Sequence, residues 1–430
     1  MLFRRKKKRR ALVLGLDGVP KSLIERFARD GTMPFLGEVF AAGTLHQARV
    51  CLPEVSNVNW TSFMTGANPG EHGVFGFTDL KPRSYTMRFP SFPDVRGDTL
   101  WDEIGREGKR CLVVNQPGCY PVRSIPGAIV SGFVAVDLKR AVAPPEALPP
   151  LQAMNYKIDV ETQGCHEDPD KLFAELDACL DARQKAVDHF LNQETWDFAE
   201  IVITGTDRLQ HFHWPSCEGE DEETERARAY YNRCDAMLRR WTEQFYGAEE
   251  PEGLFLLSDH GFCKLEREFN LNVWLKEAGY LAFTKEPPES YGDLTADSRA
   301  FAMDPGRVYV HRQGRYPDGP VTEDEAPELI AELRDKLEAI THDGAPVFER
   351  VWEHGEIYEG PLANQGPDLL CTPRRGLDVK GAIRRTETFS ESRFTGMHTW
   401  DDAFFWAAKD HGDALTISDL RPIIAGHFRG

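Results

Sequence analysis

Short apolar runs alternate with amphipathic stretches along most of this chain. The runs at residues 11–16, 110–115, 198–204 and 253–257 have few polar interruptions, which is typical of strands buried on both faces of a parallel sheet. Further strands are expected at residues 46–52, 128–132, 307–311 and 403–408. Amphipathic spacing predicts helices at residues 21–29, 34–42, 99–107, 169–192, 222–245 and 323–341. This alternation predicts an α/β fold, in which helices cover both faces of a mostly parallel central sheet to give a three-layer α/β/α sandwich.

Acidic and histidine side chains fall where several of the predicted strands end. In chain order they are Asp17 after the first strand, Asp207 and His211 after the strand at 198–204, Asp259 and His260 after the strand at 253–257, and His398 just before the last strand. Because ligands bind beyond the carboxyl ends of parallel strands, we expect these side chains to lie together at one edge of the sheet. Carboxylate oxygens and imidazole nitrogens suit Zn²⁺ or a similar divalent ion, at about 2.0–2.2 Å. Two such ions about 3.5–4 Å apart would bind the attacking and leaving oxygens of an in-line phosphoryl transfer.

Each of these positions also has a simpler explanation. Asp17-Gly18 is a common turn sequence, Asp207 and His211 are spaced like a pair at the start of a helix, and a single histidine such as His398 is most often structural. Taken one at a time, these explanations are favoured. Taken together they require several coincidences, because each position borders a predicted strand, and the metal-site hypothesis is therefore preferred.

The segment from Val55 to Gly66 predicts a turn from a strand into a helix, with Ser56 at the helix entry. A helix N-terminus offers free backbone N–H groups and the positive end of the helix dipole, so an anion fits there. A hydroxyl at this place can attack phosphorus or sulfur, although a lone serine before a helix is usually only a cap. The Asp and His pattern favours the nucleophile.

The composition is ordinary for a soluble globular protein, with 41% hydrophobic and 28% charged residues. The 430 residues allow one large α/β domain or two smaller ones. The net charge of −18 argues against nucleic acid as the main partner, because a phosphate-binding surface is usually basic. The nine cysteines include no Cys-x-x-Cys pair, and no signal peptide is recognisable, so we expect free thiols and a cytoplasmic location.

Three segments depart from the α/β pattern. Residues 1–10 are predicted to be a disordered basic tail, because residues 4–10 are seven consecutive Lys or Arg. A weak contact with an anionic membrane surface through Arg4 to Arg10 is the alternative. Residues 11–430 would form the catalytic domain, with cap insertions expected near 121–163 and 263–360 that shape the choice of leaving group.

Six short motifs stand out by their order and spacing: Leu16-Asp17-Gly18, Ser56 with Asn59 and Thr65-Gly66, Pro69-Gly70-Glu71-His72-Gly73, Thr206-Asp207 with His211, Ser258-Asp259-His260-Gly261, and Gly396-Met397-His398. Together they resemble the alkaline phosphatase superfamily, and within it the type I phosphodiesterase/nucleotide pyrophosphatase group. The resemblance extends from about residue 11 to the C-terminus, and residues from about 263 to 394 contribute little to it.

The resemblance implies an alkaline phosphatase-like fold with two divalent metal ions, with Zn²⁺ expected and Mn²⁺ as the alternative. The seven implied ligands form two groups: Asp207, His211 and His398 for one ion, and Asp17, Ser56, Asp259 and His260 for the other. Metal coordination would lower the pKa of the Ser56 hydroxyl and supply the alkoxide nucleophile. Asn59 resembles the family's side-chain donor to a non-bridging phosphate oxygen. A phospho-Ser56 intermediate would form, and water would then hydrolyse it.

The nucleophile distinguishes this chain from sulfatases. Cys51-Leu52-Pro53 matches the start of a sulfatase Cys-x-Pro-x-Arg signature, but sulfatases keep their modified Cys ten residues before the Gly of Thr-Gly, where this chain has Ser56. The Arg is also missing, because Val55 and Trp60 occupy the two possible positions. The phosphodiesterase group commonly carries Thr as nucleophile, and the Ser found here is used elsewhere in the superfamily.

A phosphodiester or pyrophosphate bond of a nucleotide-type substrate is the favoured target. No Arg lies between Val50 and Pro82, whereas a monoesterase often binds its dianionic group with Arg. The single neutral donor Asn59 suits a diester. Four aromatic residues could line a pocket for a base or be core residues, and we favour the core for at least two of them: Trp60, Phe63, Phe75 and Phe77.

Two other classes of function stay open. One is a phosphomonoesterase, phosphonate hydrolase or sulfatase on the same scaffold, and a Lys264 or Arg267 that reaches the site would favour a monoester. The other is a non-catalytic binding protein, against which the seven intact ligands argue. The expected partner is a small-molecule phosphoester, and the sequence does not indicate an oligomeric state.

Overall fold

A large, mostly parallel sheet forms the centre of the molecule. The computed structural model describes residues 9–429, and within them nine strands form this sheet in the order β22-β2-β21-β9-β1-β8-β5-β6-β7. Strands β21 and β7 run antiparallel to their neighbours, and the remaining pairings are parallel. The strands are β1 (Ala11–Leu16), β2 (Thr44–Arg49), β5 (Cys111–Gln116), β6 (Gly127–Ser131), β7 (Val142–Ala143), β8 (Phe198–Ile203), β9 (Leu254–Leu257), β21 (Ala403–Ala407) and β22 (Leu415–Thr416).

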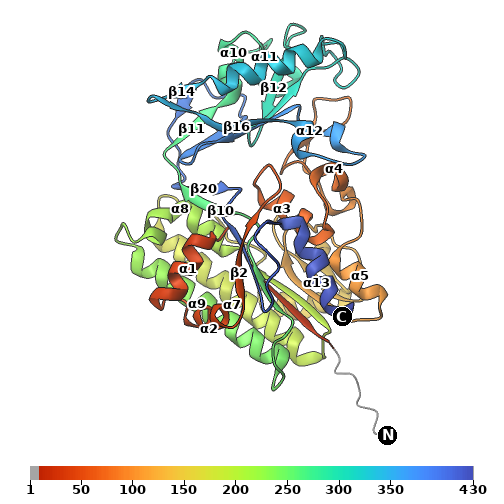
Figure 1. Cartoon of the computed structure of the whole chain (residues 1–430), viewed down its shortest axis with the longest axis vertical. Helices are drawn as coiled ribbons and strands as arrows, with labels where there is room; N and C mark the ends of the chain where they lie inside the picture. The colour runs from red at the N-terminus through yellow and green to blue at the C-terminus, as the bar shows by residue number, and fades with distance from the viewer. Residues whose placement is uncertain (1–8, 430) are drawn as a thin grey trace.

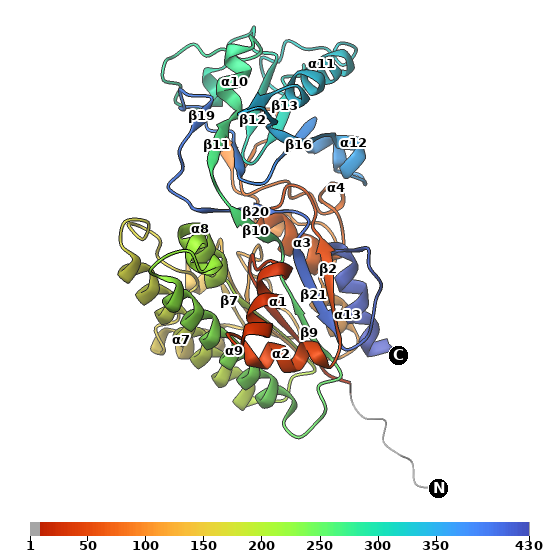
Figure 2. The same ribbon diagram turned by 60° about the vertical axis from the view of Figure 1, so that its left-hand side comes forward.

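Helices cover both faces of the sheet, as Figures 1 and 2 show. Strand β1 demonstrates the two faces, because Leu12 and Leu14 pack into one hydrophobic core and Ala11 and Val13 into the other. The first core is covered by α1 (Lys21–Asp30), α2 (Pro34–Ala41), α7 (Pro169–Gln193), α8 (Gly205–Glu218) and α9 (Thr224–Tyr246), and the second by α3 (Ser56–Thr65), α5 (Leu100–Arg106) and α13 (Leu420–Arg429). The predicted three-layer α/β/α fold is therefore confirmed.

A second body with its own core lies beyond the carboxyl ends of the central strands, in the upper part of Figure 1. It contains a four-stranded sheet in the order β12-β13-β17-β16 and a three-stranded sheet in the order β18-β11-β19. Its role as a cap over the substrate stays a prediction. The elements are β11 (Arg267–Asn270), α10 (Leu271–Glu277), β12 (Ala300–Met303), β13 (Arg307–Val310), α11 (Ala326–Glu338), β14 (Thr341–His342), β15 (Ala345–Pro346), β16 (Phe348–Glu353), α12 (His354–Ile357), β17 (Leu369–Pro373), β18 (Leu377–Lys380) and β19 (Phe389–Ser390).

The connections between the two bodies carry short elements. The antiparallel ribbon of β10 and β20 lies between the central sheet and the second body in both views. These elements are α4 (Pro69–His72), β3 (Asp79–Leu80), β4 (Met87–Arg88), β10 (Gly261–Lys264) and β20 (Gly396–Thr399). The segment 121–163, which has no clear period in the sequence, supplies the edge strands β6 and β7 together with the short helix α6 (Leu148–Ala153).

The beginning of the chain joins the folded body at Arg10. Its guanidinium Nε donates to the backbone oxygen of Trp196 at 2.9 Å and lies 4.1 Å from the ring centre of Phe245. Arg9 also contacts the folded body, because its Nη1 donates to the backbone oxygen of His427 at 2.9 Å, so the predicted disorder does not extend to Arg9 and Arg10. Residues 1–8 of the predicted tail lie outside the described residues, and their disorder and membrane contact stay predictions. All nine cysteines lie within residues 9–429 and are free. Over the same range, every helix is too short or too polar to cross a membrane.

Glu200 is an exception in the apolar interior of the sheet. It lies in β8 between Val13 of β1 and Val113 of β5, and its side chain is fully buried. Neither carboxyl oxygen has a hydrogen-bond partner among the described residues. Burial raises the pKa of Glu200 from 4.5 to about 8, so the carboxyl group is neutral in the folded protein at neutral pH.

Replacing Glu200 by Gln tests this charge state through the pH dependence of stability. The unfolded chain releases the proton above about pH 4.5 and the folded chain only near pH 8. The free energy of unfolding therefore falls as pH rises between these values, by up to roughly 1.4 kcal/mol per pH unit. We expect the thermal midpoint of the wild type to fall between pH 6 and 8 by about 2 °C or more beyond that of Glu200→Gln. The exposed Glu250→Gln should behave like the wild type, and equal pH slopes for wild type and Glu200→Gln would contradict the assignment.

Candidate active site

The parallel register of three central strands gathers three carboxylates. Leu16 of β1 pairs with Ile203 of β8, and Gly15 pairs with Leu257 of β9. The residues that follow these strand ends therefore leave the sheet at the same level. Asp17, Asp207 and Asp259 emerge there and are 3%, 2% and 0% exposed. The predicted meeting of these side chains at one edge of the sheet is confirmed.

The turn after β1 connects the first and third of these carboxylates. Gly18 has φ +70°, and in this conformation its backbone N–H donates to Asp259 Oδ1 at 3.0 Å. A Cβ atom at Gly18 would lie 2.9 Å from the Phe262 ring and 3.1 Å from the His260 ring. The position therefore requires glycine for both conformation and space.

Ser56 is the first residue of α3, directly after the N-cap residue Val55. Its hydroxyl Oγ lies 3.3 Å from Asp17 Oδ1 and 3.1 Å from His260 Nε2. The hydroxyl is thus held between a carboxylate and an imidazole, at the positive end of a helix dipole. This is the position that the sequence predicts for a nucleophile.

Trp60 holds Asp17 from the other side, which the sequence did not indicate. Its indole Nε1 donates to Asp17 Oδ2 at 2.9 Å. The ring reaches there across β1, because Gly15 has no side chain: a Cβ atom at Gly15 would lie 2.5 Å from the Trp60 ring. Gly15 and Trp60 are separated along the chain by α1, α2 and β2, so no local sequence pattern links them.

Asp207, His211 and His398 form the first of two candidate metal groups. Asp207 Oδ1 lies 3.3 Å from His398 Nε2 and 3.5 Å from His211 Nε2, and the two imidazole nitrogens are 3.0 Å apart. Asp207 and His211 are one turn apart on α8. His398 comes from β20 of the antiparallel ribbon, where it pairs with Phe262 of β10, and it therefore reaches the group from outside the central sheet.

The second group surrounds the Ser56 hydroxyl. His260 Nε2 lies 3.8 Å from Asp17 Oδ1, 3.9 Å from Asp207 Oδ1 and 3.3 Å from Asp259 Oδ2. Asp207 Oδ1 is therefore within reach of both groups. The first expected group is brought together as predicted. In the second, the donor atoms that all lie near one another come from Asp17, Asp207 and His260, and Asp259 lies beside His260.

These donor atoms fit divalent ions. Donors about 2.1 Å from one tetrahedral ion lie roughly 3.4 Å apart, which is close to the separations in both groups. His398 Nδ1 donates to the backbone oxygen of Glu54 at 2.7 Å, so its Nε2 carries the lone pair. Asp207 Oδ1 and Asp259 Oδ2 are buried without a hydrogen-bond partner among the described residues, as unoccupied ligand atoms would be.

The pKa values of the three carboxyl groups also favour a site that holds cations. Burial, together with the charges of Asp259 and Asp207, raises the pKa of Asp17 well above its usual value. Burial raises the pKa of Asp259 to about 7. The pKa of Asp207 stays below its usual value although burial opposes ionisation, because His211, His398 and Arg208 favour its charged form. Three carboxyl groups this close ionise together only when cations compensate them.

Arg208 is a second residue that sequence reasoning missed. Its Nη1 donates to Asp207 Oδ2 at 2.8 Å, and its Nη2 donates to Asp159 Oδ2 at 2.6 Å. The guanidinium also lies 4.4 Å from the ring centre of Phe133. Arg208 thereby fixes one oxygen of Asp207 and leaves Oδ1 to face the histidines. The segment 121–163 supplies both Asp159 and Phe133, so it holds the Arg208 guanidinium in place beside the site.

Asn59 does not join the group of ligands. Its Oδ1 accepts from the backbone N–H of Cys51 at 2.8 Å, and its Nδ2 donates to the backbone oxygens of Pro53 and Val55 at 3.4 and 3.3 Å. The side chain is fully buried and holds the loop that leads into α3. In this structure the hydrogen bonds of Asn59 position that loop. Its expected role as a donor to phosphate stays a prediction.

A cavity of about 310 Å³ opens beside the first metal group. It is lined from the central body by His211 and His398 and from the second body by Asp378 and Lys380. Of the four aromatic candidates, Phe77 lines the cavity, whereas the other three are buried core residues: Trp60, Phe63 and Phe75.

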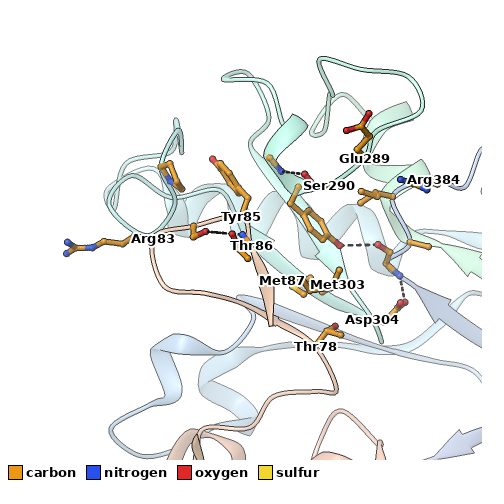
Figure 3. A pocket seen from close by; sticks show the side chains of 17 residues that line it. Thr78, Arg83, Tyr85, Thr86, Met87, Glu289, Ser290, Met303, Asp304 and Arg384 are labelled. Atoms are coloured by element: carbon orange, nitrogen blue, oxygen red, sulfur yellow. Dashed lines mark hydrogen bonds between the residues drawn. The ribbon is translucent and has the colours of Figure 1, made fainter. Parts of the chain in front are cut away.

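A larger cavity of about 820 Å³ adjoins the first and shares Thr78 and Asp304 with it. Figure 3 shows these two residues beside each other at one end of the larger cavity, with Met87 and Met303 next to them. Arg83 points away from the cavity in the same view. The shared end therefore combines the polar Thr78 and Asp304 with the apolar Met87 and Met303.

Sequence comparison identifies the family. The chain matches the type I phosphodiesterase / nucleotide pyrophosphatase family over residues 11–401, and it belongs to that family. Members of this family are phosphoester hydrolases of the alkaline phosphatase superfamily. The resemblance seen in the sequence motifs is thus confirmed.

Solved structures share the fold at low sequence identity. Phosphonoacetate hydrolase from Sinorhizobium meliloti 1021, in complex with phosphonoacetate, is 15% identical with a TM-score of 0.65 over 98% of this chain and 96% of that one. Murine ectonucleotide pyrophosphatase / phosphodiesterase 5, as an inactive variant in complex with AMP, is 11% identical with a TM-score of 0.56 over 98% of this chain and 95% of that one. The human protein of the same name is 12% identical with a TM-score of 0.57, at the same coverage.

Metal binding should stabilise the folded protein through Asp207. Zinc at about a hundredfold excess over its dissociation constant adds about 2.7 kcal/mol to the free energy of unfolding. We expect zinc to raise the thermal midpoint of the wild type by about 3 °C or more and to raise that of Asp207→Asn much less, because Asp207 Oδ1 serves both groups. The exposed Asp413→Asn is the matched control. Equal zinc shifts in wild type and Asp207→Asn would contradict the assignment.

The Trp60 indole should tune metal affinity through Asp17. Trp60→Phe keeps an aromatic side chain but removes the N–H donor, and loss of such an outer partner typically costs 10- to 100-fold in metal affinity or activity. We expect a drop of about tenfold in zinc affinity, measured by competition with a chromogenic chelator. Trp101→Phe is the control, because Trp101 is equally buried and its indole nitrogen has no partner among the described residues. A similar loss of zinc affinity in both variants would show that Trp60 acts through packing and not through its N–H donor.

Proposed function

We propose that this protein is a two-metal hydrolase that cleaves phosphodiester or pyrophosphate bonds of nucleotide-type substrates through a phospho-Ser56 intermediate. The observation that carries the proposal is the Ser56 hydroxyl, which lies within 3.3 Å of both Asp17 and His260 at the start of α3. A serine that served only as a helix cap would not need two groups of metal-binding side chains around it.

The side chains suggest how the reaction would proceed. Ser56 gives its hydroxyl proton to Asp17 Oδ1, which accepts its hydrogen bond, and Oγ attacks the phosphorus. A new P–O bond forms while the bond to the leaving oxygen breaks in line with it, and the leaving oxygen departs as an anion that takes a proton from solvent. Backbone N–H groups at the N-terminus of α3 lie on the side where the non-bridging oxygens collect negative charge. Divalent ions bound by the two groups would stabilise the negative charge on the attacking and leaving oxygens.

In the second half of the reaction, water hydrolyses the phospho-Ser56 intermediate. A water molecule attacks the phosphorus from the side of Asp207, His211 and His398, and the bond to Ser56 Oγ breaks. The released serine takes its proton back from Asp17, and the proton lost by the attacking water passes to solvent. The fixed oxygens of Asp17 and Asp207, held by Trp60 and Arg208, keep the site aligned through both steps.

Zinc is the metal proposed for both groups, with manganese as the alternative, because Asp and His ligands suit either ion. We propose a cytoplasmic location on the basis of the free cysteines. The nucleotide-type substrate is supported by the family and by the AMP-bound murine relative. The phosphonoacetate-bound relative supports a phosphonate hydrolase as the second candidate.

Parallel hydrolysis assays test the proposal. We expect the zinc- or manganese-loaded protein to cleave bis(4-nitrophenyl) phosphate faster than 4-nitrophenyl phosphate, and Ser56→Ala to lower kcat by about a thousandfold or more. Removing the metal with a chelator should abolish turnover, and adding it back should restore it. Ser62→Ala is the control, because Ser62 lies on the same helix and its hydroxyl contacts Val58 and His72 instead.

Three outcomes would revise the proposal. Faster cleavage of the monoester would keep the site and replace the substrate class. Turnover of phosphonoacetate in place of both esters would favour the phosphonate hydrolase. Turnover that survives in Ser56→Ala would contradict the phospho-serine intermediate.

A further inference from the structure

The second body places one lysine beside the candidate active site. Lys380 is the last residue of β18, and it lines the 310 Å³ cavity together with the candidate metal ligands His211 and His398. Among the residues that line this cavity, Lys380 is the single Lys or Arg. The cavity lies on the side of His211 and His398, from which the water attacks. In an in-line displacement opposite Ser56, the leaving group departs on that same side.

The backbone of β18 fixes the direction of this side chain. Leu377 and Val379 are buried in the core of the second body, whereas the alternating residues Asp378 and Lys380 are part-exposed and line the cavity. This period of two is the pattern of a strand with one face in a core and one face at an opening. The strand is held on one side by β11, where Asn270 pairs with Lys380.

Asp378 orients the Lys380 ammonium and leaves some of its N–H donors available. The two side chains form an ion pair and are 21% and 25% exposed. Within residues 9–429, Asp378 is the single ion-pair partner of Lys380, and an ammonium has three N–H donors. The nearby carboxylate of Asp304 is engaged by the backbone N–H of Gly381. Lys380 therefore keeps donors for a ligand in the cavity.

The residues first expected to bring a positive charge do not reach the cavity. Lys264 pairs with Glu220 at 3.3 Å and Arg267 with Glu391 at 3.8 Å, both outside it.

We propose that Lys380 binds an anionic group on the leaving-group side of the substrate, so that the protein selects esters whose leaving group carries a carboxylate or a phosphate. This inference rests on the proposed function and specifies its substrate class. The adjoining larger cavity, which shares Thr78 and Asp304, provides space for the remainder of such a leaving group (Figure 3).

Two matched diesters test the selection. Methyl 4-carboxyphenyl phosphate and its carboxylic methyl ester differ by one negative charge on the leaving group. For each protein we compare kcat/KM for the carboxylate with kcat/KM for the ester, so that the intrinsic reactivities cancel between wild type and variant. We expect this ratio to fall about tenfold in Lys380→Met, as for the loss of a hydrogen bond to a charged group, and Lys380→Arg to recover part of it. Lys264→Met is the control and should keep the wild-type ratio.

A binding measurement separates this inference from the proposed function. In a Ser56→Ala background with zinc present, calorimetry gives the affinity for the carboxylate and for its ester without turnover. We expect Lys380→Met to weaken carboxylate binding about tenfold more than ester binding. If the wild type cleaves neither diester, the proposed function fails, and the calorimetry still decides the role of Lys380. An equal loss for both ligands, or no loss for either, would overturn the assignment of Lys380 as an anion-binding residue.

Discussion

Electrostatic repulsion among three buried carboxylates is the constraint on which this structure depends. Parallel pairing of β8 and β9 with β1 brings Asp17, Asp207 and Asp259 to the same level at one edge of the sheet, where solvent does not screen them. Such an arrangement is costly unless positive charge is supplied. Arg208 provides part of it at Asp207. The negative charge that Arg208 leaves uncompensated makes this cluster of carboxylates and histidines a candidate site for divalent ions.

The surroundings of the site keep these charged groups in fixed orientations. Trp60 and Gly18 each hold one carboxylate through an N–H donor, at Asp17 and Asp259 respectively. The ribbon of β10 and β20 brings His398 from the far end of the chain to the same place. Because this ribbon also joins the central sheet to the second body, the candidate metal ligands are directly connected to the part of the molecule that would select the leaving group.

Much of the site could be predicted from the sequence because its residues follow hydrophobic runs. The runs ending before Asp17, Asp207 and Asp259 have the uninterrupted apolar character of buried parallel strands, and parallel strands align their carboxyl ends. Ser56 could be placed for a similar reason, since a strand-to-helix turn has a recognisable pattern. The prediction for the fold succeeded on the same basis.

Contacts that depend on three-dimensional packing could not be predicted in this way. Trp60 has the sequence context of a core aromatic, and its bond to Asp17 depends on the missing side chain of Gly15. Arg208 finds its partner Asp159 in a segment with no clear period. Lys380 lies outside the short motifs from which the family was recognised, and the alternation in Leu377-Asp378-Val379-Lys380 marks a strand but not the cavity that it faces.

Anomalous X-ray diffraction from zinc-loaded crystals tests the central claim most directly, because it locates the ions without relying on turnover. The account predicts two peaks about 3.5–4 Å apart. One peak should be bound by Asp207, His211 and His398, and the other should lie against the Ser56 hydroxyl within reach of Asp17, Asp259 and His260. A single peak, or peaks away from the carboxyl ends of β1, β8 and β9, would contradict the two-metal account.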